Sequence, residues 1–257
     1  MTNMRIGRVI LHIPHSSTKI PYRDGYRVDE SLLADEQLLL TDWYTDDLFQ
    51  CPDAISVIAD FSRIFCDVER FENDAEEMMS EVGMGVLYES RDDGSPLREV
   101  TLDLRARIIS DYYRPHHRKL TEAVDSQLQQ FGQALIIDCH SFPDKPLRRD
   151  LNQDPDRPDY NIGTDGFHTS GKLLQAAKAF FSERNLTVGI NSPYAGSIVP
   201  AKYYHRDKRV QTIMLEINRR LYLEAHSSTK TGNYSGVKET IGEFIDRLTI
   251  SNMRICE

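Results

Sequence analysis

Short apolar runs recur along the chain and predict the strands of a sheet. The run over residues 134–138 is the clearest, because it is continuously apolar, as in a buried strand, and stops at polar residues. Residues 8–13 form a similar β-branched run that ends at Pro14. Further strands are predicted over residues 55–59, 64–68, 187–190 and 212–217.

Apolar residues at helical spacing predict helices between these strands. Over residues 29–50 the leucines return at roughly helical spacing, which would place Asp42 and Asp46 one turn apart on one helix. A second long helix is predicted over residues 103–131, with a kink or restart at Pro115 and an end at Gly132. Helices are also predicted over residues 170–185 and 236–250.

Strands that alternate with helices predict an α/β fold with a mixed, mostly parallel sheet flanked by helices. The ligand site of such a sheet lies beyond the carboxyl ends of its strands, where His15, His140 and Glu216 are expected. Residues 69–98 and 142–169 lack a clear period and are predicted to be long loops. Without a repeat or a linker, residues 1–257 are expected to form one domain.

Composition excludes several classes of protein. A net charge of −9 argues against a nucleic-acid partner, and the apolar runs are far shorter than the ~20 residues that span a bilayer. The N-terminus lacks the apolar stretch of a signal peptide, so a cytoplasmic protein without a membrane partner is expected. An acidic protein with an anionic small-molecule substrate must concentrate arginines near its site. The oligomeric state is not predicted.

The histidines and carboxylates at the strand ends offer metal chemistry. A catalytic zinc commonly has three protein ligands from His and carboxylate, which His15, His140 and either Asp42 or Asp46 can supply. On spacing alone, these histidines are equally well interpreted as loop residues bonded to the backbone, and His12 as a core residue. Cys139 beside His140 is interpreted as a core thiol rather than a nucleophile.

An ordered set of segments resembles the N-formylglutamate amidohydrolase family. The resemblance runs from residue 8 to about residue 224. It begins with His-Ile-Pro-His15-Ser-Ser and Thr-Asp42-Trp. It continues through Phe-Ser-Arg63-Ile-Phe-Cys-Asp67-Val-Glu69-Arg70, Pro-His-His117-Arg-Lys-Leu, Asp-Cys-His140-Ser-Phe, Tyr160-Asn-Ile-Gly-Thr, Asn191-Ser-Pro-Tyr194-Ala-Gly196 and Leu-Glu216-Ile-Asn. Glu69 stands where the family usually has asparagine.

The resemblance implies a fold like that of the zinc carboxypeptidases and other zinc exopeptidases (phosphorylase/hydrolase-like). It also implies one zinc ion held by His15, Asp42 and His140, with Glu216 as the group that moves protons. The implied reaction is hydrolysis of N-formyl-L-glutamate to formate and L-glutamate. The alternative for Glu216 is a structural ion pair with Arg219 or Arg220.

Substrate-binding residues follow from the same motifs. We expect Arg63 to bind the glutamate moiety and Asp67 to orient Arg63 or Arg70, although an internal Arg–Asp pair that fixes the loop explains them nearly as well. His117 is expected to contact the substrate or a metal ligand, or to be simply buried. For Asn191, Tyr194 and Gly196, closure over a ligand competes with a plain turn.

Two other functions remain open at this point. A zinc amidase or peptidase that acts on another small peptide or cell-wall amide would use the same metal site, and the negative charge of Glu69 near the expected carboxylate site favours it. A non-catalytic binding protein that retains the fold is the other alternative, although such a protein has no need of both the ligands and Glu216.

Overall fold

The computed structural model describes residues 9–253, whose six strands form one mixed sheet in the order β2-β1-β3-β6-β4-β5. The strands are β1 (Ile10–Ile13), β2 (Ile55–Ile58), β3 (Ala134–Phe142), β4 (Tyr160–Gly163), β5 (Val188–Ile190) and β6 (Val210–Asn218). The neighbours β2, β1, β3 and β6 are parallel, and β4 pairs with β6 in the antiparallel direction. The predicted α/β fold with a mostly parallel sheet is confirmed.

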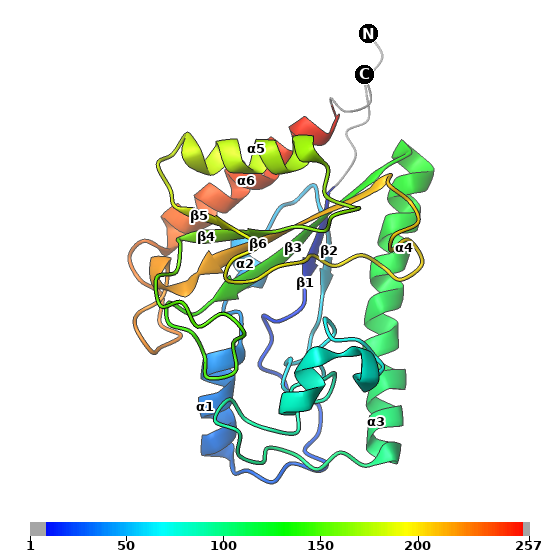
Figure 1. Ribbon diagram of the computed structural model, residues 1–257, viewed down its shortest axis with the longest axis vertical. Coiled ribbons are helices and arrows are strands. Elements are labelled where there is room, and N and C mark those ends of the chain that lie inside the picture. The colour runs from blue at the N-terminus through cyan, green and yellow to red at the C-terminus, as the bar shows by residue number, and fades with distance from the viewer. Residues whose placement is uncertain (1–8, 254–257) are drawn as a thin grey trace.

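Helices cover both faces of the sheet (Figure 1). On one face, α2 (Thr45–Leu48), α5 (Gly171–Ser182) and α6 (Tyr234–Met253) pack in a core cluster with Leu11, Ile137 and Leu215 of the central strands. On the other face, α4 (Arg114–Phe131) packs through Leu120 against Ile136. The remaining helices, α1 (Glu30–Leu40) and α3 (Leu102–Ile108), lie below the sheet in Figure 1.

The two long predicted helices are interrupted in the structure. The first divides into α1 and α2, because residues 41–44 leave the helical path and Tyr44 has φ 63°. The second contains the π-helical turn Ile109–Tyr113 between α3 and α4. Pro115 is the second residue of α4, directly after this π-helical turn, and Gly132 ends the helix in the left-handed conformation, as predicted.

One strand prediction and part of one loop prediction were wrong. Residues 64–68 form turns rather than a strand, and their apolar side chains are buried because they pack in core clusters with Leu33 and Ile108. Conversely, β4 lies within the predicted loop 142–169. Short apolar runs do not by themselves separate a strand from a buried turn. Residues 69–98 form the predicted irregular excursion, apart from the 3-10 turns Asp74–Glu76 and Met78–Val82. Arg8, the first residue of the predicted strand 8–13, lies outside the described residues.

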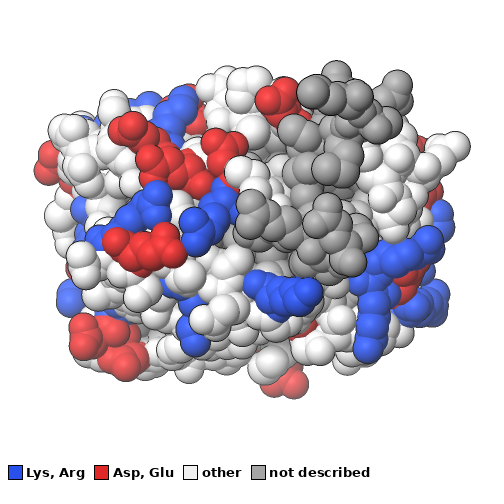
Figure 2. All heavy atoms as spheres, turned by 90° about the horizontal axis from the view of Figure 1, so that it is seen from above, with Lys and Arg blue, Asp and Glu red and all other residues white. Residues whose placement is uncertain are grey.

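Acidic and basic side chains are mixed on the face seen from above in Figure 2, where α5 and α6 lie. Two ion pairs join the residues that follow α5 to α6: Arg184 lies 2.6 Å from Glu243, and Arg247 lies 2.9 Å from Glu183. No helix within residues 9–253 is both long and apolar enough to cross a membrane.

Candidate metal and active site

Side-chain alternation along the central strands directs four ionisable groups to the same face of the sheet. Leu11, Ile137 and Leu215 point to the α5–α6 side, so the alternate residues point to the other side. These are His12 of β1, Asp138 and His140 of β3, and Glu216 of β6, all buried. His12 is in register with Asp138, and His140 with Glu216. His140 therefore lies within a strand that is longer than predicted, rather than beyond its end.

Asp42 reaches the site from the break between α1 and α2. Its backbone N–H donates to the carbonyl of His15 at 3.0 Å, and its own carbonyl accepts a bond from the Thr45 hydroxyl at 2.9 Å. Asp42 is almost fully buried, whereas Asp46 is exposed on α2. The two aspartates are thus not one turn apart on a single helix, and only Asp42 joins the histidines.

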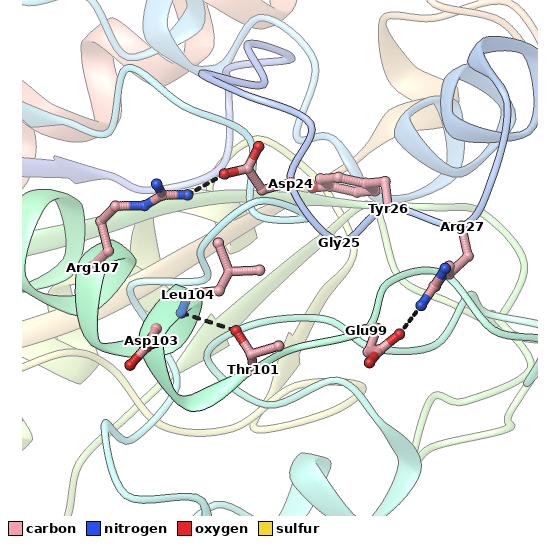
Figure 3. Close-up of a pocket in the computed structure, with 9 residues that line it drawn as sticks. All are labelled: Asp24, Gly25, Tyr26, Arg27, Glu99, Thr101, Asp103, Leu104 and Arg107. Carbon is pink, nitrogen blue, oxygen red and sulfur yellow. Dashed lines mark hydrogen bonds and ion pairs between the residues drawn. The ribbon is translucent and has the colours of Figure 1, made fainter.

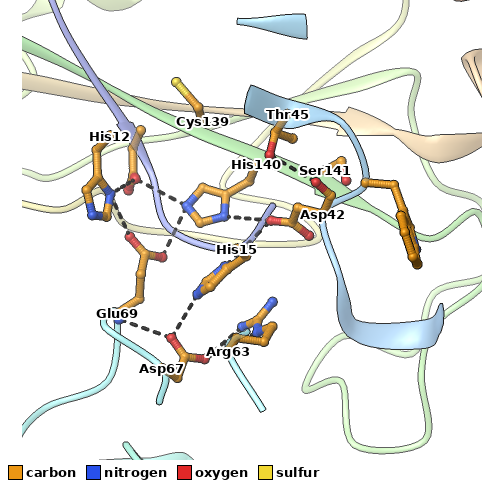
Figure 4. A network of polar contacts seen from close by, with 12 residues as sticks. His12, His15, Asp42, Thr45, Arg63, Asp67, Glu69, Cys139, His140 and Ser141 are labelled. Atoms are coloured by element: carbon orange, nitrogen blue, oxygen red, sulfur yellow. Dashed lines mark hydrogen bonds and ion pairs between the residues drawn. The ribbon is translucent and has the colours of Figure 1, made fainter. Parts of the chain in front are cut away.

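His15, Asp42 and His140 face one another (Figure 4). Oδ2 of Asp42 lies 3.1 Å from Nδ1 of His140 and 3.5 Å from Nδ1 of His15. Although burial alone would raise the pKa of the Asp42 carboxyl, its hydrogen bond to His140, its contact with His15 and the charge of Arg219 hold that pKa well below its usual value. Asp42 is therefore an anion at neutral pH.

The other ring nitrogen of each histidine meets a carboxylate on the far side. Nε2 of His15 lies 2.8 Å from Asp67, and Nε2 of His140 lies 3.1 Å from Glu69 and 3.2 Å from Asp138. Carboxylates in this position fix the tautomer and the orientation of metal-binding histidines. Both rings are thus held with Nδ1 directed at Asp42.

The donor set fits a metal ion of the zinc class. The three ligand atoms lie within 4.8 Å of one another, and Nδ1 of the buried His15 has no hydrogen-bond partner among the described residues. Ligands of a tetrahedral zinc with bonds of about 2.0–2.1 Å stand roughly 3.3 Å apart, close to the 3.1 and 3.5 Å separations here. Two imidazoles and one carboxylate leave a fourth position open for water, as in catalytic zinc sites.

A second group of possible ligands, His12, Glu69 and Asp138, supports the first. Nδ1 of His12 already bonds Asp138 at 2.8 Å, and its Nε2 lies 2.9 Å from Nε2 of His116. Although burial would lower the pKa of His12, the bonds to Asp138 and Glu69 raise it to about 9. We interpret this group as the charged support of His140.

Glu69 belongs to that support rather than to a carboxylate-binding surface. Its two oxygens lie 3.4 Å from His12 and 3.1 Å from His140. Burial alone would raise the pKa of its carboxyl, but the charge of His140 and the bond to His12 hold that pKa well below its usual value. The negative charge at this position is therefore compensated by histidines.

Glu216 is the carboxylate without a cationic partner in the site. Burial, with a contribution from the charge of Asp42, raises its pKa to about 8, and its buried Oε2 atom has no hydrogen-bond partner within residues 9–253. The structural ion pair considered for it is not formed, because Arg219 pairs with Asp42 at 2.9 Å and Arg220 with Asp144 at 2.7 Å. A carboxylate with a raised pKa is suited to accept and return a proton.

Arg63 and Arg70 lie at the same site and share one acid. Arg63 contacts Asp67 at 3.0 Å, and Arg70 lies 3.7 Å from the same carboxylate. The hydroxyl of Tyr88 donates to that carboxylate at 2.7 Å. Asp67 thus orients both arginines and His15 together, which the sequence suggested only in part.

A cavity of about 190 Å³ opens over His15, Asp42 and His140. Its lining includes Arg63, Arg70, Tyr194 and Glu216 among the expected residues. His117, Asn191 and Gly196 are not among the residues that line it. His117 packs against Tyr113 instead, with ring centroids 4.2 Å apart, and the Asn191 amide donates to Thr164.

Cys139 takes no part in the site. It points to the opposite side of β3 from His140 (Figure 4), and burial raises the pKa of its thiol well above the usual value. Its thiol donates to the carbonyl of Ile137 at 3.2 Å. The interpretation of Cys139 as a core thiol agrees with this environment.

A larger cavity, of about 620 Å³, lies elsewhere, between the loop at Gly25 and the start of α3 (Figure 3). Its charged side chains pair with one another, Arg27 with Glu99 and Arg107 with Asp24. It shares no lining residue with the cavity over His15 and His140. The large volume of this cavity does not by itself indicate a functional site.

Sequence reasoning did not identify Asp138 as a partner of His140. Asp138 directly precedes the Cys139-His140 pair, and alternation along a strand would have placed it on the same face as His140. His12 was interpreted as a core residue. Its register with Asp138 could have identified the contact, but register is not visible in a single strand.

Comparisons with known proteins identify the family of this chain. The model of the N-formylglutamate amidohydrolase family matches residues 7–223. The chain belongs to this family. N-formylglutamate deformylases of Pseudomonas putida and Pseudomonas aeruginosa are each 25% identical to it, over 229 and 232 residues. The first match covers 84% of this chain and 82% of the P. putida protein. The second covers 85% of this chain and 84% of the P. aeruginosa protein.

Solved structures show the same fold. The N-formylglutamate amidohydrolase of Ralstonia eutropha JMP134 superposes with a TM-score of 0.85 at 24% identity, over 98% of this chain and 96% of that one. A gene product of Agrobacterium tumefaciens superposes with a TM-score of 0.64 at 20% identity, over 98% and 92%. The expected family and the expected enzyme class, an amidohydrolase, are confirmed.

Proposed function

We propose that this member of the N-formylglutamate amidohydrolase family hydrolyses N-formyl-L-glutamate to formate and L-glutamate with one zinc ion held by His15, Asp42 and His140. The observation that carries the proposal is the register of His140 with Glu216 on neighbouring strands. Glu216, whose pKa is raised, thus lies on the strand next to His140, one of the proposed ligands. The names of the Pseudomonas relatives support the choice of substrate.

The chain's own residues supply binding and proton transfer. Bound zinc would lower the pKa of a water molecule toward ~7 and polarise the formyl carbonyl. Glu216 takes a proton from the attacking water, whose oxygen bonds to the formyl carbon. Glu216 then returns the proton to the amide nitrogen as the C–N bond breaks, which releases formate and the amine of L-glutamate. Asp67 holds His15 and Arg63 in place during this step.

The test is an assay of purified protein with N-formyl-L-glutamate, beside N-acetyl-L-glutamate and a dipeptide. We expect formate release from the formyl compound that a chelator abolishes and added zinc restores. Zinc-dependent turnover of only the dipeptide would replace the substrate and keep the metal chemistry. Turnover unaffected by complete removal of metal would contradict the zinc mechanism.

A further inference from the structure

Four arginines line the cavity over the metal-binding side chains, and three of them are already paired with acids. Arg63 and Arg70 share Asp67, and Arg219 contacts Asp42. Among the described residues, Arg149 forms no ion pair with a carboxylate. Its Nη1 atom is buried and has no hydrogen-bond partner. A buried donor on a charged group is costly to leave unmatched, so this guanidinium is prepared for an acceptor that enters the cavity.

The backbone and side chain of Arg149 are held in place by Asp92. The Arg149 amide donates to Oδ1 of Asp92 at 3.2 Å, and its Nε donates to the Asp92 carbonyl at 3.2 Å. The amide of Arg148 donates to the other oxygen of Asp92. Glu36 of α1 in turn accepts the Asp92 amide at 2.6 Å. A guanidinium fixed from two loops and a helix loses little freedom when it binds an anion.

The acid next to Arg149 in sequence does not neutralise it. Asp150 also lines the cavity, but Arg157 lies 2.8 Å from its carboxylate and the Tyr194 hydroxyl donates to it at 3.0 Å. The Leu147 amide donates to the same carboxylate at 2.9 Å. Asp150 is therefore already paired and does not bind the Arg149 guanidinium, and Asp92 accepts bonds from the backbone amides of Arg148 and Arg149.

We propose that Arg149 binds the side-chain carboxylate of the substrate and so selects N-acylated acidic amino acids. This inference rests on the proposed function. The α-carboxylate lies one carbon from the amide nitrogen, so it must lie beside the reacting group, where Arg63 contacts the Asp67 that holds His15. The side-chain carboxylate extends further. Leu147, Met79 and Met84 line the cavity and belong to one apolar cluster, which suits the intervening methylenes.

The test compares R149Q and R149K with the wild type on N-formyl-L-glutamate and N-formyl-L-glutamine. We expect R149Q to reduce the ratio of the two kcat/KM values by about 10²-fold, the scale of a lost charge-assisted bond, with the loss confined to the glutamate compound. R149K should recover only part of the ratio, because lysine lacks the planar fork. R148Q is the matched control, since that side chain is exposed and its ratio should stay within twofold of wild type.

A binding measurement separates this inference from the proposed function. Calorimetry should show that the wild type binds L-glutamate more tightly than L-glutamine and that R149Q loses this preference. A wild-type ratio in R149Q, or an equal loss on both substrates, would overturn the role of Arg149. Absence of turnover of N-formyl-L-glutamate by the wild type would instead overturn the proposed function, and the binding preference would still test Arg149.

Discussion

The Nε2 atom of His15 lies 2.8 Å from Oδ1 of Asp67. Although burial would raise the pKa of Asp67, the charges of His15 and Arg63 hold it well below its usual value, so this carboxylate only accepts hydrogen bonds. When His15 carries a single proton, as a metal ligand must, that proton lies on Nε2 beside Asp67. Its Nδ1 lone pair is then directed at Asp42, as a metal ligand requires.

Asp67→Asn should weaken metal binding without removing a ligand. Loss of the carboxylate charge behind His15 should lower zinc affinity by about 10–100-fold, the usual effect of changing such a partner. Competition with a chromophoric chelator measures this affinity. Asp60→Asn, on an exposed side chain in the same segment, should leave it unchanged. Equal zinc affinity in Asp67→Asn and wild type would remove Asp67 from this role.

Asp42→Asn and Asp46→Asn separate the two aspartates that the sequence left as alternatives. Asp42→Asn should lose most of the bound zinc, because it removes the anionic ligand from a buried site. Asp46→Asn should keep about one zinc per chain, because Asp46 is exposed. Elemental analysis of the purified variants measures the content. Retention of zinc by Asp42→Asn would assign the ligand elsewhere.

Glu216→Gln should separate catalysis from metal binding. The variant keeps the shape of the side chain but cannot accept the proton, so kcat should fall by about 10²-fold or more while zinc content stays the same. Formate release under saturating substrate measures kcat. Glu224→Gln, at an exposed position, is the control. Full turnover by Glu216→Gln would exclude Glu216 as the base.

Glu36→Gln should stabilise the protein at alkaline pH. Burial raises the pKa of Glu36 to about 7, above its usual 4.5. The protonated form is favoured by folding, so its stabilising effect is present below about pH 4.5 and is lost as pH rises through 7. Glutamine is neutral at every pH and still accepts the bond from the Asp92 amide.

We therefore expect Glu36→Gln to raise the melting temperature by roughly 2–5 °C at pH 8 and by clearly less at pH 5. Thermal unfolding at the two pH values measures the difference. Asp35→Asn, the exposed neighbour on α1, makes the same change of charge and should show no such pH dependence. A gain that is larger at pH 5 than at pH 8 would contradict a raised pKa for Glu36.

The strands that carry the site could be predicted because their signal is local. The apolar run before Asp138 is readable in the sequence, and it correctly positioned His140 near the carboxyl end of a strand. The break at Tyr44 could not be predicted, because the backbone bond from Asp42 to His15 that accompanies it joins residues far apart in the chain. For the same reason, the contact between Glu69 and His140 depends on tertiary structure alone.

The family resemblance identified individual site residues, which the periodicity of apolar residues could not do. It pointed to Asp42, with Asp46 left as an alternative, and singled out Glu216; in the structure Asp42 contacts His140 and Glu216 is in register with it. It did not indicate Arg149, which lies in a proline-rich stretch outside every motif. Loop residues of this kind become interpretable only when their backbone bonds are known, as those to Asp92 are here.

The register between His140 and Glu216 has a consequence for how this scaffold can be altered. The spacing of these two residues is set by backbone hydrogen bonds between β3 and β6, which do not depend on the loops above them. The segment at residues 147–150 can therefore be exchanged for that of a relative while the reacting groups keep their distance. If Arg149 has the proposed role, libraries that vary only this loop should change the preferred substrate and leave the groups on β3 and β6 in place.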